Sequence, residues 1–201
     1  MNNSGLIKMA ARVGMIGPIL FASVVTGLTI VQADFMRSLG WDPFHNVLDW
    51  PSGLALGSYG WLMTAAFFVS GAAMMFFAYG LRLALNEKLA PTLMMLAGFA
   101  MMGLVFATDP TLGSTPRTWH GLLHDSFFVL LGLTLMPSML LLGFDFRRYD
   151  GWKNLSIYTW ITVALAIPTF WLKGAAFYVF LSAILVWSEV MAFRLKLMET
   201  N

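Results

Sequence analysis

The chain has 201 residues, of which 59% are hydrophobic and only 11% charged, and its mean hydropathy is +0.74. Typical globular domains are about 45–50% apolar and about 25% charged, so this composition argues against a soluble domain or a nucleic-acid-binding protein. The net charge of +2 is too small to indicate an anionic partner. Cysteine is absent, which excludes disulfides, thiolate metal sites and thiol catalysis.

Six long apolar runs predict six membrane-spanning helices. They cover residues 13–33, 59–81, 91–107, 121–143, 155–172 and 175–193. Each run is long enough to cross about 30 Å of hydrocarbon as a helix. The runs are continuously apolar, whereas the strands of a membrane barrel alternate between lumen and lipid. The predicted fold is therefore an all-α membrane protein: a six-helix bundle in one polytopic domain, 1–201, with a long outer loop at 34–58.

The basic residues predict the orientation of this bundle. Nine of the twelve lie at the N-terminus, in the second and fourth connections, and in the C-terminal tail. The other three are Arg37, Arg117 and Lys173, on the opposite side. By the positive-inside rule both termini are cytoplasmic. We therefore expect a multi-pass protein of the cell inner (plasma) membrane.

Polar side chains collect on the outer side, where all three histidines and five of the ten acidic residues lie. His120 and His124 are four residues apart, which places them on one face of a helix. This spacing suits two imidazoles that bind one metal ion, and His45 in the outer loop is the only other histidine. Three imidazoles and a water would form an open zinc site that faces the periplasmic or extracellular side.

Nearby carboxyl and hydroxyl groups could assist such a site. Asp109, Asp125 or Asp42 could orient or deprotonate the metal-bound water. Ser52, Ser58 or Ser126 could help to hold an oxyanion. The same residues could instead form a hydrogen-bonded polar cluster without a metal, or a site for a ligand or a lipid headgroup. In the second apolar run, Ala66 and Ser70 form a pair of small residues that predicts close helix contact.

Three segments resemble the domain-of-unknown-function 998 family: LGSYGW at 56–61, FATDP at 106–110 and WHGLLHD at 119–125. The six apolar runs and the length fit this family across nearly the whole chain. The resemblance implies an integral membrane protein of prokaryotic type, without a settled activity. It marks as site positions Ser58, Tyr59, Gly60, Trp61, Asp109, His120, His124 and Asp125.

The chain is also loosely similar to the superfamily of alkaline ceramidases and adiponectin-type receptors. Those are multi-span hydrolases whose zinc is held by three histidines, two of them in a His-x-x-x-His pair. This sequence departs from that pattern in two ways. It has six apparent spans and not seven, and its histidine pair lies at the start of the fourth span and not in the last.

Three functions stay open at this point. The first is a metal-assisted hydrolase of a lipid or amphiphile, which the polar cluster at bilayer depth suggests. The second is a non-catalytic subunit or scaffold of a larger membrane complex, and the third is a transporter or lipid-binding protein. The expected partners are membrane lipid and either a second copy or another membrane protein, and not nucleic acid.

Overall fold

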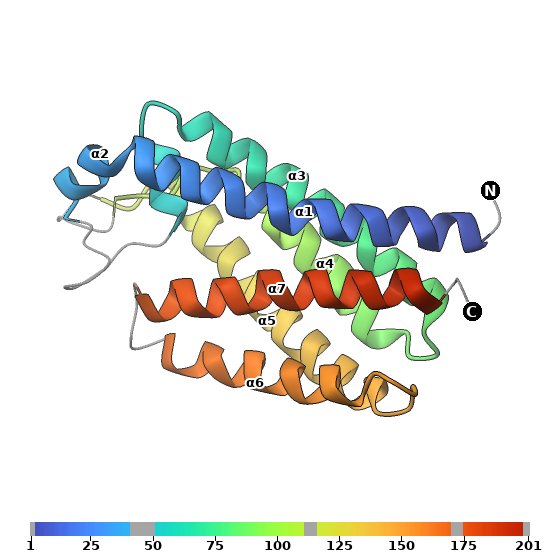
Figure 1. The fold of residues 1–201 in the computed structure, drawn as a ribbon. Helices are drawn as coiled ribbons and strands as arrows, with labels where there is room; N and C mark the ends of the chain where they lie inside the picture. The colour runs from blue at the N-terminus through green and yellow to red at the C-terminus, as the bar shows by residue number, and fades with distance from the viewer. Residues whose placement is uncertain (1–2, 41–50, 111–115, 170–174, 199–201) are drawn as a thin grey trace.

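A computed structural model describes residues 3–40, 51–110, 116–169 and 175–198, and within these ranges all regular structure is helical. Figure 1 shows the order of the elements. They are α1 (Asn3–Val31), α2 (Ala33–Ser38), the 3-10 helix η1 (Pro51–Leu56), α3 (Gly60–Ala84), α4 (Leu89–Gly103), α5 (Trp119–Phe146), α6 (Lys153–Thr169) and α7 (Ala175–Met198).

A long helix lies at each of the six predicted positions. Four of them, α1, α3, α5 and α7, are long and apolar enough to cross a membrane. The other two have 15 residues (α4) and 17 residues (α6), which at 1.5 Å per residue is less than the thickness of a bilayer core. The all-helical prediction is thus confirmed in the described residues, and the apolar helices fit a membrane-embedded protein.

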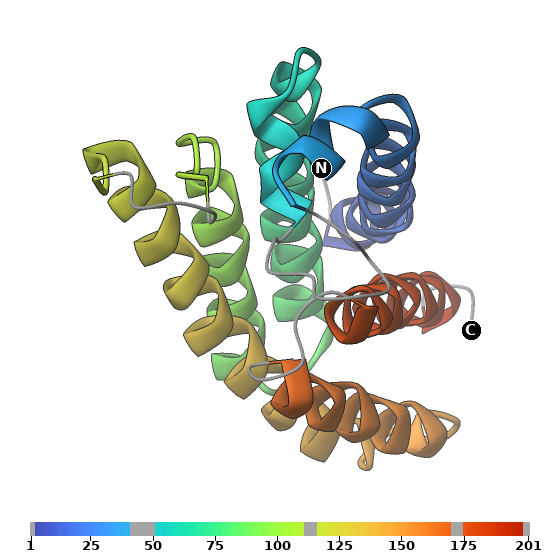
Figure 2. The same ribbon diagram turned by 90° about the vertical axis from the view of Figure 1, so that its left-hand side faces the viewer.

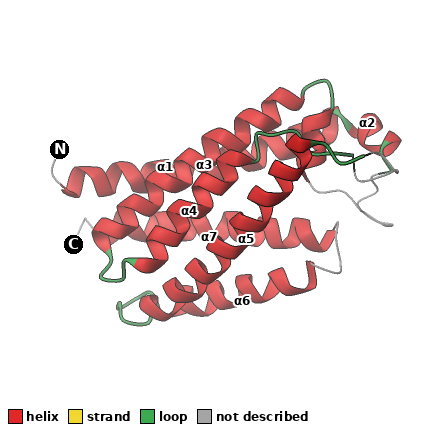
Figure 3. Ribbon diagram, turned by 180° about the vertical axis from the view of Figure 1, so that it is seen from behind, coloured by secondary structure: helices red, strands yellow, loops and turns green. Residues whose placement is uncertain are grey.

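The six long helices form a closed ring, which Figure 2 shows nearly end-on. Each of α1, α3, α4, α5, α6 and α7 packs on the next, and α7 returns to α1. Successive long helices run in opposite directions, as the view from behind in Figure 3 also shows. The beginning of α1 and the end of α7 therefore lie at the same end of the molecule (Figure 1).

The main chains of α3 and α4 approach each other closely at two glycines. A Cβ atom on Gly71 would lie 2.6 Å from the carbonyl oxygen of Gly98, and one on Gly98 would lie 2.7 Å from that of Gly71. Neither position has room for a side chain, so the two backbones approach closely, as small residues allow in membrane helices. The predicted pair of small residues, Ala66 and Ser70, does not lie at this contact. Ala66 is buried in the core, and Ser70 lines a cavity.

The buried side chains form two clusters along the ring axis. The larger cluster includes Phe77, Met139 and Trp187, and the smaller includes Phe21 and Phe67. Large apolar side chains also cover the outside of the ring, for example Ile16, Phe99, Phe144 and Val179. A bundle that is apolar both inside and outside is what a lipid solvent favours.

The predicted outer loop at 34–58 contains two short helices, α2 and η1, in its described parts. Gln32, at the end of α1, is buried with 5% exposure. Its side chain connects α1 to η1 by hydrogen bonds. Its Nε2 donates to the carbonyl oxygen of Leu54 (2.9 Å), and its Oε1 accepts from the backbone N–H of Tyr59 (3.0 Å). The loop therefore returns into the bundle, and Pro51 and Ser52 form part of the cavity wall.

Candidate functional site

The link between α4 and α5 forms the polar part of the site. Helix α4 ends at Gly103, four residues before the end of the predicted run. The carbonyl groups of Phe106 and Ala107 therefore lie outside any helix and are free to accept hydrogen bonds. They accept from the two histidines at the start of α5: His124 Nδ1 is 2.8 Å from the Phe106 oxygen, and His120 Nδ1 is 2.9 Å from the Ala107 oxygen.

His124 is the more buried of the two histidines, with 4% exposure. The edge of its ring faces Phe67 on α3, at 6.2 Å between ring centroids. Because a carbonyl oxygen can only accept, Nδ1 carries the proton, and in the neutral imidazole Nε2 is then an acceptor. His124 thus joins the link to α5 and presents a hydrogen-bond acceptor inside the bundle.

Thr118 connects Asp109 to the start of α5. Its Oγ1 accepts from the backbone N–H of Gly121 (3.1 Å), as an N-cap residue does. The same hydroxyl donates to Asp109 Oδ1 (2.6 Å), and the backbone N–H of Thr118 donates to Asp109 Oδ2 (2.9 Å). The hydroxyl hydrogen bond, followed by the backbone one, lowers the pKa of Asp109, because both favour the ionised carboxylate.

His120 joins the same network, since its Nδ1 lies 2.9 Å from Thr118 Oγ1. The structure therefore brings Asp109 and His120 together through Thr118, a residue that the sequence analysis did not select. A signal for it was present, because a threonine directly before a predicted helix is a favoured N-cap. The network positions the helix and the two imidazoles.

The other predicted catalytic residues lie apart from this network. Asp125 forms an ion pair with Arg117, and both side chains are about half exposed or more. Ser58 is exposed in the turn before α3. Within the ranges that the structure describes, no group of three His, Asp or Glu side chains is arranged to hold a metal ion. The proposed third ligand, His45, lies outside those ranges.

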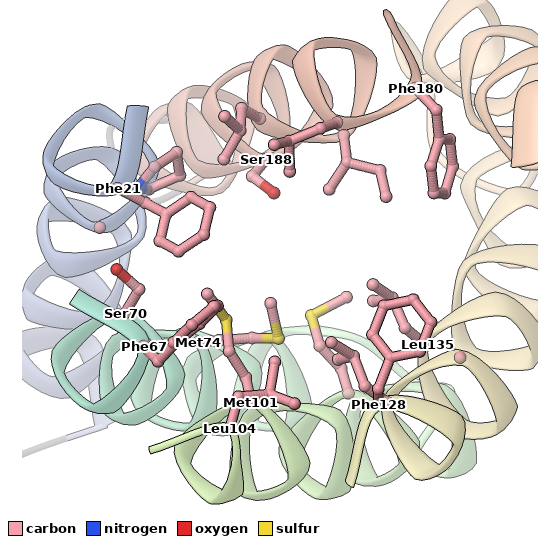
Figure 4. Close-up of a pocket in the computed structure, with 18 of the residues that line it drawn as sticks. Phe21, Phe67, Ser70, Met74, Met101, Leu104, Phe128, Leu135, Phe180 and Ser188 are labelled. Carbon is pink, nitrogen blue, oxygen red and sulfur yellow. The ribbon is translucent and has the colours of Figure 1, made fainter. Parts of the chain in front are cut away.

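The second part of the site is a cavity of about 620 Å³ inside the ring, shown in Figure 4. All six long helices and η1 contribute to its wall, which includes the aromatic residues Phe21, Phe67, Phe77, Phe128, Phe177, Phe180 and Trp187. Proteins usually have few voids larger than a water molecule. A space of this size with a mostly apolar wall is typical of a ligand-binding pocket.

Few polar side chains line this cavity, and no Asp, Glu, Lys or Arg is among its described lining residues. The polar ones are Ser52, Ser70, His124, Thr169 and Ser188. The hydroxyl of Thr169 donates to the carbonyl oxygen of Ala166. That of Ser70 is buried and has no hydrogen-bond partner among the residues that the structure describes.

Sequence reasoning missed Ser70 and Ser188 as site residues, because a lone serine within an apolar run has no distinguishing pattern. Only the packing of the helices shows that both residues lie in the cavity wall. In Figure 4 the Ser188 hydroxyl points into the open space, whereas that of Ser70 lies at its margin beside α1.

Comparison with known proteins gives a family match. The family described as "Protein of unknown function (DUF998)" matches residues 15–194, which include all the described polar residues of the site. No curated protein and no solved structure matches the chain. The family match covers most of the chain and agrees with the resemblance of its three short segments. The chain therefore belongs to the DUF998 family of proteins of unknown function.

Proposed function

We propose that this protein binds a lipid-like amphiphile within the membrane, in the cavity that the six long helices surround. The observation that carries the proposal is the size of the cavity together with its apolar wall. Contacts with such a wall favour an apolar occupant, because filling the space gains dispersion attraction and removes apolar surface from water.

The proposal includes the topology that the charges predict. The chain is then a single domain of six spans with cytoplasmic termini, in which α4 and α6 cross the bilayer as short helices. The network of Asp109, Thr118 and His120 would face the periplasmic or extracellular side. Helix α1 begins and α7 ends at the same end of the molecule, which supports an even number of membrane crossings (Figure 1).

Lipid analysis of paired variants tests the binding. Leu185 lines the cavity, and the next residue, Val186, is 54% exposed on the outside of α7. We expect Leu185→Trp to fill part of the cavity, and Val186→Trp to leave it unchanged. After purification in mild detergent, mass spectrometry should find a stoichiometric amphiphile with the wild type and Val186→Trp, and at least tenfold less with Leu185→Trp. Equal amounts of bound lipid in all three would contradict the proposal.

A metal-assisted hydrolase is a second candidate, and one observation favours it. Both imidazoles at the start of α5 donate Nδ1–H to a main-chain carbonyl, which is how metal-binding histidines are commonly oriented. Their Nε2 atoms would bind the zinc together with His45, and the ion would supply an activated water. Elemental analysis tests this. Stoichiometric zinc in the wild type, lost in His120→Ala and His45→Ala, is expected, and metal-free wild type would contradict it.

A further inference from the structure

The cavity wall reaches the outside of the ring beside α5. The exposed residues among its described lining residues all belong to this helix: Val129, Gly132, Leu133 and Pro137. Leu133 is 69% exposed and Val129 is 57% exposed, although both line the cavity. Their spacing places all four residues on one side of the helix. Along this side of α5 the cavity is therefore open to the surroundings of the ring.

The opening does not lie between α5 and α4, because these two helices are in contact along the whole stretch. Before the exposed residues, Phe127 packs on Gly103, where a Cβ atom would lie 2.3 Å from the phenylalanine ring. After them, Ser138 donates to the carbonyl oxygen of Ala90 on α4 (2.7 Å). The opening must therefore face the other neighbour of α5, which is α6.

Helices α5 and α6 pack closely at one end and separate toward the other. Near the end of α5, the hydroxyl of Ser156 donates to the carbonyl oxygen of Gly143, and the ring of Trp160 also packs on Gly143. Ile167 follows Trp160 by two helical turns on the same face of α6, yet it is 58% exposed. Figures 2 and 3 both show α5 leaning away from α6 toward the start of α5. The opening therefore lies between these two helices.

The depth of the opening limits what can pass through it. Gly132 is thirteen residues after the first residue of α5 and fourteen before the last, which is about 20 Å from either end. Because α5 is long and apolar enough to cross a membrane, its midpoint lies among lipid chains, and water and headgroups lie near its ends. A hydrocarbon chain of the bilayer is therefore the group that reaches this opening directly.

Gly132 also provides space for such a chain. A Cβ atom at this position would meet nothing within 4 Å, so no packing contact in the described part of the chain requires a glycine. Glycine is less favourable than alanine inside a helix. A ligand that passes close to the main chain of α5 would account for a glycine at this point, since only glycine leaves the backbone uncovered.

The wall determines how much of a lipid can enter. No Asp, Glu, Lys or Arg is among its described lining residues. A charged headgroup inside the ring would lose its hydration without gaining an opposite charge, which is costly. A hydrocarbon chain has no such cost, and it gains dispersion contacts with the apolar wall.

We propose, on the basis of the amphiphile-binding function above, that the occupant is one acyl chain of a bilayer phospholipid. The chain enters sideways between α5 and α6, across Gly132, and the headgroup stays outside the ring. Because α5 and α6 are in contact at Gly143, the lipid belongs to the leaflet at the start of α5. The ligand therefore comes from the membrane and not from water.

Photo-crosslinking tests this inference. The full chain is reconstituted in phosphatidylcholine vesicles with a trace of phosphatidylcholine that carries a diazirine, either near the end of one acyl chain or next to its ester. Residue-resolved mass spectrometry then compares Met94 and Met101, which line the cavity and are 1% and 9% exposed, with Phe99 on the outside of α4, which is 51% exposed. We expect the chain-end probe to label the two methionines as well as Phe99, and the ester probe to label neither methionine.

Variants at the opening test the route. Gly132→Trp should fill the opening and lower methionine labelling, relative to Phe99, on the order of fivefold or more, because a filled space excludes a chain. Gly27→Trp on α1 is the matched control, since a Cβ atom at Gly27 also meets nothing within 4 Å and Gly27 is not a lining residue. It should be labelled like the wild type. Leu133→Trp repeats the test at a second position, so that the result does not depend on one variant.

The outcomes separate this inference from the function on which it rests. Equal methionine labelling by both probes, or labelling unchanged in both Gly132→Trp and Leu133→Trp, would overturn the lateral entry of a single chain. So would unlabelled methionines in a wild type that co-purifies with a stoichiometric lipid, and each of these results leaves amphiphile binding intact. Absence of methionine labelling by every probe, together with absence of a co-purified lipid, would overturn the function itself.

Discussion

The carboxylate of Asp109 packs directly on the main chain of Gly121, in the space that a Cβ atom would occupy. Thr118 holds the carboxylate there with two hydrogen bonds. The α4–α5 link therefore packs against the first turn of α5 at Gly121, where there is no room for a side chain.

Gly121→Ala should destabilise the protein. The new methyl group would overlap the Asp109 carboxylate and displace it from Thr118, which would disturb the cap of α5. Loss of a helix cap costs about 0.5–2 kcal/mol, and thermal unfolding in detergent measures it. Gly132→Ala in the same helix is the control, since its Cβ would meet nothing within 4 Å. The control should be neutral or more stable, because alanine favours helix by up to about 1 kcal/mol. Equal melting temperatures for both variants would contradict the proposed fit.

His124 should tolerate asparagine better than alanine. The amide nitrogen of asparagine can take the place of Nδ1 and donate to the Phe106 carbonyl oxygen. His124→Ala leaves that carbonyl without its partner and removes a buried ring, which should cost on the order of 2–3 kcal/mol. Denaturant unfolding of the two variants beside the wild type measures the difference. If both lost the same stability, the hydrogen bond to Phe106 would not be the important contact.

Acid should remove the contribution of Asp109 to stability. Its pKa in the folded protein is below the ordinary value of 3.8, because Thr118 donates to the ionised form. The contribution is therefore complete above the unfolded pKa, and is lost as the pH falls through the lower folded pKa. The melting temperature of the wild type should exceed that of Asp109→Asn by a constant amount above about pH 5. This excess should shrink below pH 3.8, and an excess that grew in acid would contradict the ionised carboxylate.

The absence of natural cysteine allows a direct test of topology. Pro116 lies in the exposed α4–α5 link, and Asp150 is exposed between α5 and α6. Single Pro116→Cys and Asp150→Cys variants are expressed in a bacterial host and treated with a membrane-impermeant maleimide. We expect Pro116→Cys to react in intact cells and Asp150→Cys to react only after permeabilisation. The reverse pattern would invert the proposed orientation, and labelling of both in intact cells would contradict a crossing by α5.

The apolar runs predicted where each long helix lies, because continuous hydrophobicity is a local property of the sequence. The end of α4 could not be predicted in this way, since Leu104, Val105 and Phe106 are as apolar as the helix before them. The helix ends before them because the carbonyl groups of Phe106 and Ala107 accept hydrogen bonds from His124 and His120. The hydropathy of a residue does not show whether its carbonyl group will accept such a hydrogen bond.

The site was predicted only in part, for a similar reason. The spacing of His120 and His124 correctly placed both at the start of one helix. It could not show that each ring donates to the link, or that Asp125 pairs with Arg117 on the surface. The cavity itself depends on all six long helices facing one space, which is a property of the closed ring and not of any one helix.

The return of α7 to α1 also determines when the cavity can form. Helix α7 follows the other five long helices in the chain, and it completes the wall that α1 begins. Until α7 is inserted, Phe21 on α1 and Phe67 on α3 border an open groove that lipid or a neighbouring chain can enter. Exposed apolar surfaces of this kind are where incomplete chains misassemble. A chain that stops after α6 should therefore be a substrate for membrane quality control, and a ligand able to bridge α1 and α7 should protect the newly made protein from degradation.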